Sequence, residues 1–380
     1  MLSRHAVPVG RILGIPIDLD PSWFLVFALL TWTLAVGYYP AEFKNWPALE
    51  YWIVGAITAC CLYGSVLLHE LGHSVVARRY GIPVRRITLF IFGGVAQIAS
   101  EPPSPGAEFW VAIAGPVVSA FLAAGFRLAE PALPSGSALL ALARYLAYIN
   151  GALLLFNLIP GFPLDGGRIF RAVVWRFTRS MRRATVVAGN VGRFVGFLFI
   201  LTGVWKIFGG SLINGMWIAF IGWFLESAAL AQIQLQTAHA LLAGHTVAES
   251  MDRRYAEIDA DTALNALRED PLLRPGEPSA VVTSGGRVLG LVSPHSFEEV
   301  PRAKWPTTPV AEVMIPLSRM KWVRPDTDLE AALEVMERDG LHQLPVMEDG
   351  QVVGMLTRSN LIGFLRGLRS RNGEHWSPAR

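Results

Sequence analysis

The sequence is poor in charge and in cysteine, and both shortages limit what kind of protein it encodes. Charged residues make up 17% of its 380 residues, against about 25% in an average soluble domain, while apolar residues make up 52%. This balance excludes a fully soluble protein, a disordered chain and a fibrous protein. The two cysteines, Cys60 and Cys61, are adjacent in an apolar run, which excludes a disulfide scaffold and a four-cysteine zinc site. The net charge of +3 is too small to indicate nucleic-acid binding.

A pattern typical of a cleavable signal peptide is missing as well, because Pro8 and Pro16 interrupt the first residues and no small-residue cleavage pattern follows. The sequence has long apolar runs instead. A helix needs about 20 predominantly apolar residues to cross a bilayer. Six runs come close to or exceed this length, and we expect each to span the membrane: Ser22–Tyr38, Trp52–Val76, Phe109–Leu128, Ala138–Leu158, Val191–Phe208 and Leu212–Leu230.

Basic residues are distributed unevenly among the loops. They gather before the first run, after the second and after the fourth, and they are scarce on the opposite side. Because cytoplasmic loops carry an excess of Lys and Arg, we expect the N-terminus to be cytoplasmic, and six spans return the C-terminus to the same side. The basic residues behind this prediction are Arg4, Arg11, Arg78, Arg79, Arg85, Arg86, Arg168, Arg171, Arg176, Arg179, Arg182 and Arg183.

The segment Ile87–Ala99 does not fit a span, because it follows Arg85 and Arg86 and is rich in β-formers. Gly93 and Gly94 lie in its middle, so it is predicted to be a β-hairpin that lies against the membrane domain. Two interpretations of this hairpin remain open. Its exposed edge adds a strand from an extended peptide, or it is an ordinary hairpin that covers a loop.

After Gln234 the composition changes to that of a soluble α/β domain, and this region contains an internal repeat. Each copy reads as a strand, a helix, two strands and a helix. The matching segments are offset by 63 and 64 residues: Val247–Met251 matches Val310–Met314, and Gly286–Leu291 matches Gly350–Met355.

The strongest motif lies in the second run and reads His69-Glu70-Leu71-Gly72-His73. On a helix, residues four apart share one face, so both imidazoles are able to hold one zinc ion. Three protein ligands leave a fourth position for a water molecule, whose pKa zinc lowers to about 7, and Glu70 is placed to take its proton. Unpartnered ionisable side chains are costly inside an apolar span, which favours the metal site over a chance match.

Asp165 is the candidate third ligand. It directly follows the fourth run, while His69 and His73 lie near the cytoplasmic end of the second, so both parts of the site fall at one membrane depth. The alternative for Asp165 is a helix N-cap before the letters GGRIF. Asn157 is a candidate donor to a developing oxyanion, or else an ordinary amide at a helix end.

These segments resemble the site-2 proteases, a family of intramembrane zinc metallopeptidases, in the branch with C-terminal CBS (cystathionine β-synthase) domains. The resemblance is carried by HELGH, NLIPGFPLDGGR, FGGVAQ and AGPVVS, and in the second repeat by VAEVM and DTDLEAALEVMERDGLHQLPVMEDGQVVGMLTRSNL. It implies that His69, His73 and Asp165 bind one Zn²⁺ per chain and that Glu70 is the catalytic base. It further implies that Asn157 lines the active site and that Gly93, Gly94 and Gln97 belong to a substrate-docking hairpin.

The fold implied is a polytopic α-helical membrane protein of about six spans with a short membrane-associated β-hairpin, followed by a soluble α/β CBS pair. The expected divisions are 1–238 for the metalloprotease domain, 239–306 for a degenerate CBS repeat, 307–370 for a CBS repeat and 371–380 for a tail. The expected location is the plasma membrane of a prokaryote. The implied activity is cleavage of transmembrane segments in membrane-tethered regulators, such as a transcription regulator or an anti-sigma factor.

Two departures from the family pattern affect these expectations. The Gly-Pro stretch often ends in Asn in this family, whereas Ser119 stands at that place here. CBS modules that bind adenine nucleotides often have Thr/Ser-x-x-Asp after the final strand. Thr357–Asn360 and Ser293–Ser296 lack that carboxylate, so a structural module, or one that forms a homodimer, competes with nucleotide sensing.

Two other functions compete with proteolysis. A metal transporter regulated by the CBS module is the first, although the spans are nearly free of acidic residues apart from Glu226. A membrane receptor that uses zinc only structurally is the second, and an open coordination position argues against it.

Overall fold

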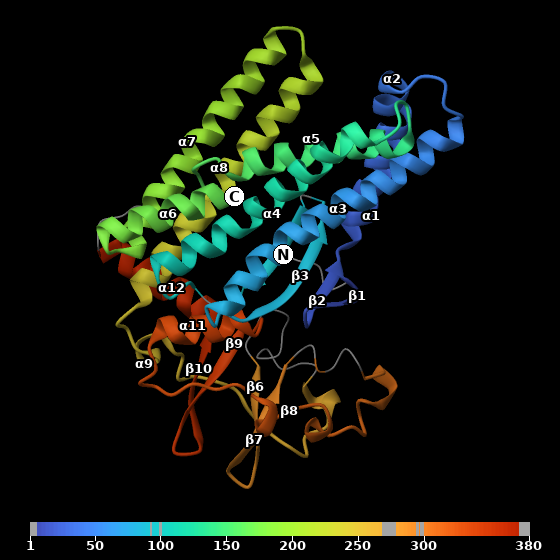
Figure 1. The fold of residues 1–380 in the computed structure, drawn as a ribbon. Coiled ribbons are helices and arrows are strands. Elements are labelled where there is room, and N and C mark those ends of the chain that lie inside the picture. The colour runs from blue at the N-terminus through green and yellow to red at the C-terminus, as the bar shows by residue number, and fades with distance from the viewer. Residues whose placement is uncertain are drawn as a thin grey trace. The chain divides into compact units, whose positions relative to one another are not determined.

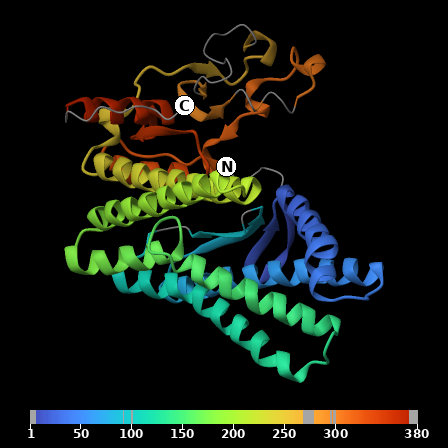
Figure 2. The same cartoon turned by 90° about the horizontal axis from the view of Figure 1, so that it is seen from above.

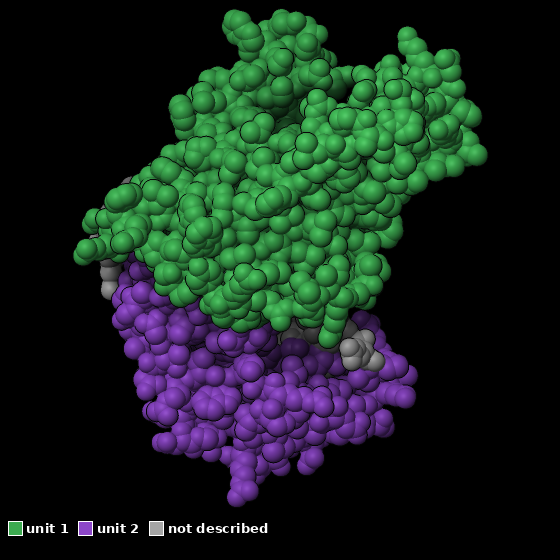
Figure 3. All heavy atoms as spheres, in the orientation of Figure 1, with its two compact units in different colours: residues 1–234 green, residues 235–380 purple. Residues whose placement is uncertain are grey.

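The computed structural model describes residues 6–91, 93–98, 101–267, 279–293, 296 and 300–371. The chain divides into two compact units, residues 1–234 and 235–380, which are coloured separately in Figure 3. Most of the predicted tail 371–380, and Pro294 and His295 of the first repeat, lie outside the described residues.

Among the described residues, six helical segments are long and apolar enough to cross a membrane, and they coincide with the six predicted spans. A shorter helix, α6 (Asp165–Thr178), lies between the fourth and the fifth. The spans are α1 (Pro21–Thr33) continued by the π-helical η1 (Leu34–Tyr38) and by α2 (Tyr39–Glu42), α3 (Ala48–Arg79), α4 (Pro105–Ala129) with the 3₁₀ turn η2 (Glu130–Ala132), α5 (Ala138–Asn157), α7 (Met181–Phe208) and α8 (Leu212–Leu242).

The starts of these helices follow from local sequence. Asp20, Ser104 and Ser137 are N-caps whose side-chain oxygens accept backbone N–H groups of α1, α4 and α5. Proline occupies the first helical position of α1 and α4, where its missing N–H costs no hydrogen bond.

Helices α3, α4 and α5 lie side by side in the first unit, with α4 in the middle (Figures 1 and 2). Glycines allow the backbones to approach closely. A Cβ atom at Gly72 of α3 would lie 2.9 Å from the carbonyl oxygen of Ala114 in α4, and one at Gly196 of α7 would lie 2.7 Å from that of Gly222 in α8. Small residues at such crossings are the usual basis of helix packing in a bilayer.

The predicted hairpin is present, as half of a mixed four-stranded sheet in the order β1-β2-β3-β4. The strands β3 (Val84–Phe90) and β4 (Gly93–Ile98) are antiparallel, as are β1 (Val7–Ile12) and β2 (Ile15–Leu19). β2 runs parallel to β3, with Ile17 opposite Ile87.

The strands β1 and β2 were not predicted, because Pro8 and Pro16 read as chain breaks. Pro8 lies in an edge strand, where a proline costs least, beside a bulge between Pro8 and Gly10. Buried residues of the sheet, including Ile15 and Ile87, pack on Tyr63 and Leu71 of α3. The sheet is therefore attached to the helix that carries the His-Glu-x-x-His motif.

In the described part of the second unit there are two sheets, of order β5-β6-β7-β8 and β10-β9. Its second repeat shows the expected helix, two strands and helix, with a short strand before them. The elements of the unit are α9 (Val247–Ser250), β5 (Glu257–Asp259), η3 (Leu264–Leu267), β6 (Ala280–Ser284), β7 (Arg287–Val292), η5 (Arg302–Lys304), η6 (Val310–Glu312), β8 (Ile315–Pro316), η7 (Leu317–Arg319), α11 (Leu329–Arg338), β9 (Gln343–Glu348), β10 (Gln351–Thr357) and α12 (Arg358–Arg371).

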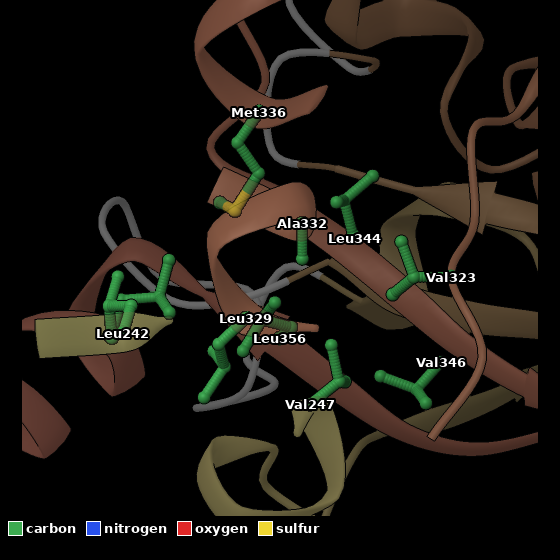
Figure 4. Packing of buried hydrophobic residues seen from close by; sticks show 10 residues of the cluster. Leu242, Val247, Val323, Leu329, Ala332, Met336, Leu344, Val346 and Leu356 are labelled. Carbon is green, nitrogen blue, oxygen red and sulfur yellow. The ribbon is translucent and has the colours of Figure 1, made fainter. Parts of the chain in front are cut away.

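The two repeats exchange their first segments. Asp252 of the first copy bridges to Met355 of the second, while Ile315 of the second pairs with Leu291 of the first. Gln343 accepts a hydrogen bond from the backbone N–H of Ser279, its counterpart 64 residues earlier. In Figure 4 the buried core around α11 includes Leu242, the last residue of α8, together with residues of both copies' segments.

Candidate metal centre

The two histidines of α3 and the aspartate of α6 meet at one point. The Nε2 atoms of His69 and His73 lie 3.0 Å and 3.2 Å from the same atom, Oδ2 of Asp165. One ligand atom from each residue falls within 4.8 Å of the others. Both histidines are buried, with 4% of each residue exposed. The helical spacing of His69 and His73 produces the pair, and the start of α6 adds the carboxylate.

The second ring nitrogen of each histidine has a partner on α4. His73 Nδ1 lies 2.7 Å from the carbonyl oxygen of Val111, and His69 Nδ1 lies 2.8 Å from Oγ of Ser119. A carbonyl only accepts, so His73 donates through Nδ1–H. We assign the same tautomer to His69, with Ser119 as its acceptor. Such outer partners fix the tautomer and the orientation of metal-binding histidines.

These hydrogen bonds make the donor set fit a zinc ion. With Nδ1 protonated, each Nε2 carries a lone pair, and both lone pairs face Oδ2 of Asp165. Two acceptor nitrogens beside a carboxylate oxygen repel one another unless a cation lies between them. Two imidazoles and one carboxylate are ligands that catalytic zinc sites use, with a further position for water.

Asp165 supplies the carboxylate of the donor set, and its Oδ2 is the atom that both imidazoles face. A carboxylate must be ionised to bind a metal ion. Asp165 is not the N-cap of α6, because Leu164 occupies that position.

Glycines before and after Asp165 allow close backbone contacts that determine the position of its carboxylate. A Cβ atom at Gly166 would lie 2.4 Å from the carbonyl oxygen of Leu158, and one at Gly167 would lie 2.3 Å from the carbonyl carbon of Gly161. Gly161 in turn meets Gly192 of α7, where a Cβ atom at Gly161 would lie 2.5 Å from the Cα atom of Gly192. The first turn of α6 therefore packs directly on the preceding loop, which fixes the carboxylate.

The backbone of α4 closes one side of the site at Gly115. A Cβ atom there would lie 2.2 Å from Nε2 of His73 and 2.6 Å from Nε2 of His69. Only glycine leaves room for both imidazoles at this position. Ser119, Val111 and Gly115 share a helical face. In the sequence, the letters AGPVVS marked part of this face, but they did not reveal that it contacts the histidines.

Glu70 lies against the edge strand β4. Its Oε2 accepts a hydrogen bond of 3.2 Å from the backbone N–H of Ala96, and a Cβ atom at Gly94 would lie 2.6 Å from Cγ of Glu70. Gly93 begins β4 with a φ of +123°, a backbone conformation that favours glycine, and the partly buried Gln97 follows Ala96. The strand predicted for substrate docking is thus beside the predicted base.

Asn157 is a predicted site residue that no described contact links to the metal ligands or to Glu70. It is the last residue of α5 and is partly buried. Among the described residues, no hydrogen bond joins Asn157 to His69, His73, Asp165 or Glu70.

Comparison with known proteins agrees with this site. A model of peptidase family M50 matches residues 57–132 and 130–203, which include the motif of α3 and Asp165. A model of the CBS domain matches residues 310–367.

Two relatives cover nearly the whole chain. The protein named "Putative zinc metalloprotease Rip3" from Mycobacterium tuberculosis is 35% identical over 372 residues, which is 95% of this chain and 93% of that protein. The protein named "Putative zinc metalloprotease sll0528" from Synechocystis is 34% identical over 374 residues, 96% of each chain. A solved structure, the site-2 protease from Methanocaldococcus jannaschii, matches with a TM-score of 0.41 and 27% identity over 60% of this chain and 95% of that one.

The family match contains His69, His73 and Asp165, the residues that meet at the metal centre. The two relatives that cover nearly the whole chain are both named as zinc metalloproteases. The enzyme is a multi-pass membrane protein that uses Zn²⁺. The chain belongs to peptidase family M50, the site-2 protease family of zinc metalloproteases, and carries a C-terminal CBS domain.

Proposed function

We propose that this metalloprotease hydrolyses peptide bonds within transmembrane segments of membrane-tethered regulatory proteins. In this proposal His69, His73 and Asp165 hold the zinc ion, and Glu70 is the general base. The observation that carries it is the approach of two buried imidazoles to one carboxylate oxygen, with the other ring nitrogens bound to α4.

The chemistry is divided between the metal ion and the chain. When bound, zinc supplies a water molecule of lowered pKa and polarises the substrate carbonyl. Glu70 takes a proton as the water attacks and passes it to the leaving amine. The N–H of Ala96 holds Oε2 of Glu70, which leaves Oε1 as the oxygen that receives the proton.

The edge of β4 is proposed to receive the substrate. The backbone N–H of Ala96 points away from β3 toward Glu70. Because the direction of the backbone N–H alternates along a strand, the N–H groups of Gly94 and Ile98 point to the same open edge of β4. A transmembrane helix shields its own peptide bonds and must unwind before water can attack. An unwound segment added to β4 comes to lie beside Glu70. Gly93 and Gly94 leave room for it, and Gln97 flanks it.

The loop charges support the proposed orientation. The proposal places both termini in the cytoplasm of a prokaryotic cell, with the protein in the plasma membrane. The basic residues around β3 and α6 then lie on the inner side, as positively charged loops do. The metalloprotease domain is proposed to cover 1–238 and the repeats to cover 239–306 and 307–370.

The CBS pair is proposed to be regulatory or to form a homodimer. Asn360 stands where a nucleotide-binding module often has Asp. Its Oδ1 accepts hydrogen bonds from the backbone N–H and the hydroxyl of Thr357, which caps the start of α12. This contact favours a structural use of the residue over binding to the ribose of an adenine nucleotide. A CBS-regulated metal transporter is not supported, because the relatives that cover the chain are named as metalloproteases.

The test uses the purified full-length protein in proteoliposomes with a single-span model substrate that carries an Asn-Pro pair in its transmembrane helix. Glu70→Gln is expected to retain zinc and to lose cleavage, whereas His73→Ala loses both. Glu226→Gln, in a partly exposed pair with Arg193 between α7 and α8, is the control and keeps both. Cleavage by Glu70→Gln at the wild-type rate contradicts the assignment of the base.

A further inference from the structure

A buried ion pair connects the helix of Asp165 to the helix that orients the histidines. Arg171 of α6, six residues after Asp165, forms a salt bridge with Glu108 of α4 through its guanidinium nitrogens. The Glu108 side chain is fully buried, and 4% of the Arg171 side chain is exposed. The pair therefore lies inside the protein, where it is not screened by solvent.

The guanidinium of Arg171 reaches three further segments. It lies 3.4 Å from the hydroxyl of Thr185 in α7 and 5.2 Å from the ring centre of Phe162, in the loop before Asp165. It also lies 3.7 Å from Oε2 of the exposed Glu101, between β4 and α4. One side chain thus contacts α7, the loop before Asp165 and the segment between β4 and α4 in addition to Glu108 of α4.

Glu108 shares its face of α4 with the groups that touch the histidines. Val111, Gly115 and Ser119 follow it at intervals of three and four residues, the spacing of one helical face. Val111 accepts from His73, Ser119 contacts His69, and Gly115 lies against both imidazoles. The ion pair ties the α6 helix to this face.

The pair is costly to bury, so its presence calls for an explanation other than stability. Desolvation of two charges commonly cancels their attraction, and apolar residues of similar volume are often as good or better. Oε2 of Glu108 is buried and has no hydrogen-bond partner among the described residues, which adds to the cost.

We propose that Arg171 and Glu108 are positioning residues that hold Asp165 at coordination distance from His69 and His73. The ion pair fixes the angle and depth of α6 relative to α4, because its fork geometry permits one arrangement where apolar packing permits several. This inference rests on the proposed zinc ligands.

The decisive variant removes both charges at once. Glu108→Met combined with Arg171→Met leaves no unpaired buried charge, so the zinc-free variant is expected to fold with thermal stability equal to or higher than that of the zinc-free wild type. Its dissociation constant for zinc is expected to rise about 10-fold to 100-fold, as for loss of other outer partners of a metal site. The visible absorption of the Co²⁺-loaded protein is expected to change, because a displaced Asp165 alters the coordination geometry.

A second variant covers the case in which the double variant does not fold. Arg171→Lys keeps the positive charge but loses the fork that joins Glu108 and Thr185, and it is expected to weaken zinc binding in the same direction. Glu226→Gln, which removes one member of the partly exposed pair with Arg193 between α7 and α8, is the control and leaves the zinc affinity unchanged.

Asp165→Asn, measured in the same titration, separates the two proposals. If this variant binds zinc as tightly as the wild type, the proposed ligand set is wrong. If it binds weakly while the folded Glu108→Met/Arg171→Met variant keeps the wild-type affinity and Co²⁺ spectrum, the ligand set stands and the positioning role is overturned. Should the double variant not fold, wild-type zinc binding by Arg171→Lys overturns it.

Discussion

His69 Nε2 and Asp165 Oδ2 lie 3.0 Å apart although 96 residues separate them in the sequence. Helix α4 takes no direct part in this contact. It binds the other ring nitrogen, Nδ1, of each imidazole. The metal centre is therefore built between α3 and the start of α6, with α4 as its support.

Removal of the metal is expected to abolish activity and to destabilise the folded protein. A ligand that binds only the folded state, at about 100 times its dissociation constant, contributes about 2.7 kcal/mol to the free energy of unfolding. Dialysis against a chelator is expected to lower the thermal midpoint in detergent, and added Zn²⁺ is expected to restore it. An unchanged midpoint in the zinc-free protein argues against a bound zinc ion.

Substitution of Ser119 tests the partner of His69. Ser119→Ala removes the acceptor of the Nδ1 proton, and zinc affinity or activity is expected to fall about 10-fold to 100-fold. Ser65→Ala is the matched control, because Ser65 is also a buried hydroxyl, donates to the carbonyl of Cys61 and makes no described contact with a histidine. Equal effects of the two variants rule out a specific role for Ser119.

Gly115→Ala tests the close approach of α4 to the imidazoles. The added methyl group meets Nε2 of His73 at 2.2 Å, so the ring must move and zinc binding is expected to be lost. Gly125→Ala is the control on the same helix, because a Cβ atom there meets nothing within 4 Å. Zinc is measured in both purified proteins by atomic emission. Full zinc content in Gly115→Ala contradicts the described geometry.

Ala96→Pro tests the contact between β4 and Glu70. The substitution removes the N–H that holds Oε2, and kcat is expected to fall by about 10² or more while zinc is retained. Val9→Pro, at the bulge of the opposite edge strand β1, is the control and is expected to leave kcat unchanged. If Ala96→Pro retains the wild-type kcat, the edge of β4 does not orient the base.

Local sequence predicted those parts of the protein that depend on nearby residues. The six spans follow from apolar length, and the approach of His69 to His73 follows from helical spacing. The strands β1 and β2 were missed because β2 pairs with β3, which lies about 70 residues further along the chain, and no local signal reveals a parallel pairing at that separation. Pro8 and Pro16 also obscured the strand pattern.

The supporting contacts of the site were beyond sequence reasoning for the same reason. Glu108 and Arg171 are 63 residues apart, and neither belongs to the motifs that indicate a metal site. Ser119 stood out only as a departure from the family pattern, and its contact with His69 depends on how α4 packs against α3. Asn157 shows the opposite case, in which a motif residue has no described hydrogen bond to the ligands.

The most direct test of the central proposal is anomalous diffraction at the zinc absorption edge from crystals of the full-length protein. One anomalous peak is expected, within about 2.0–2.2 Å of Nε2 of His69, Nε2 of His73 and a carboxylate oxygen of Asp165. A peak at another set of side chains, or a zinc ion bound by both histidines with Asp165 turned away, would contradict it.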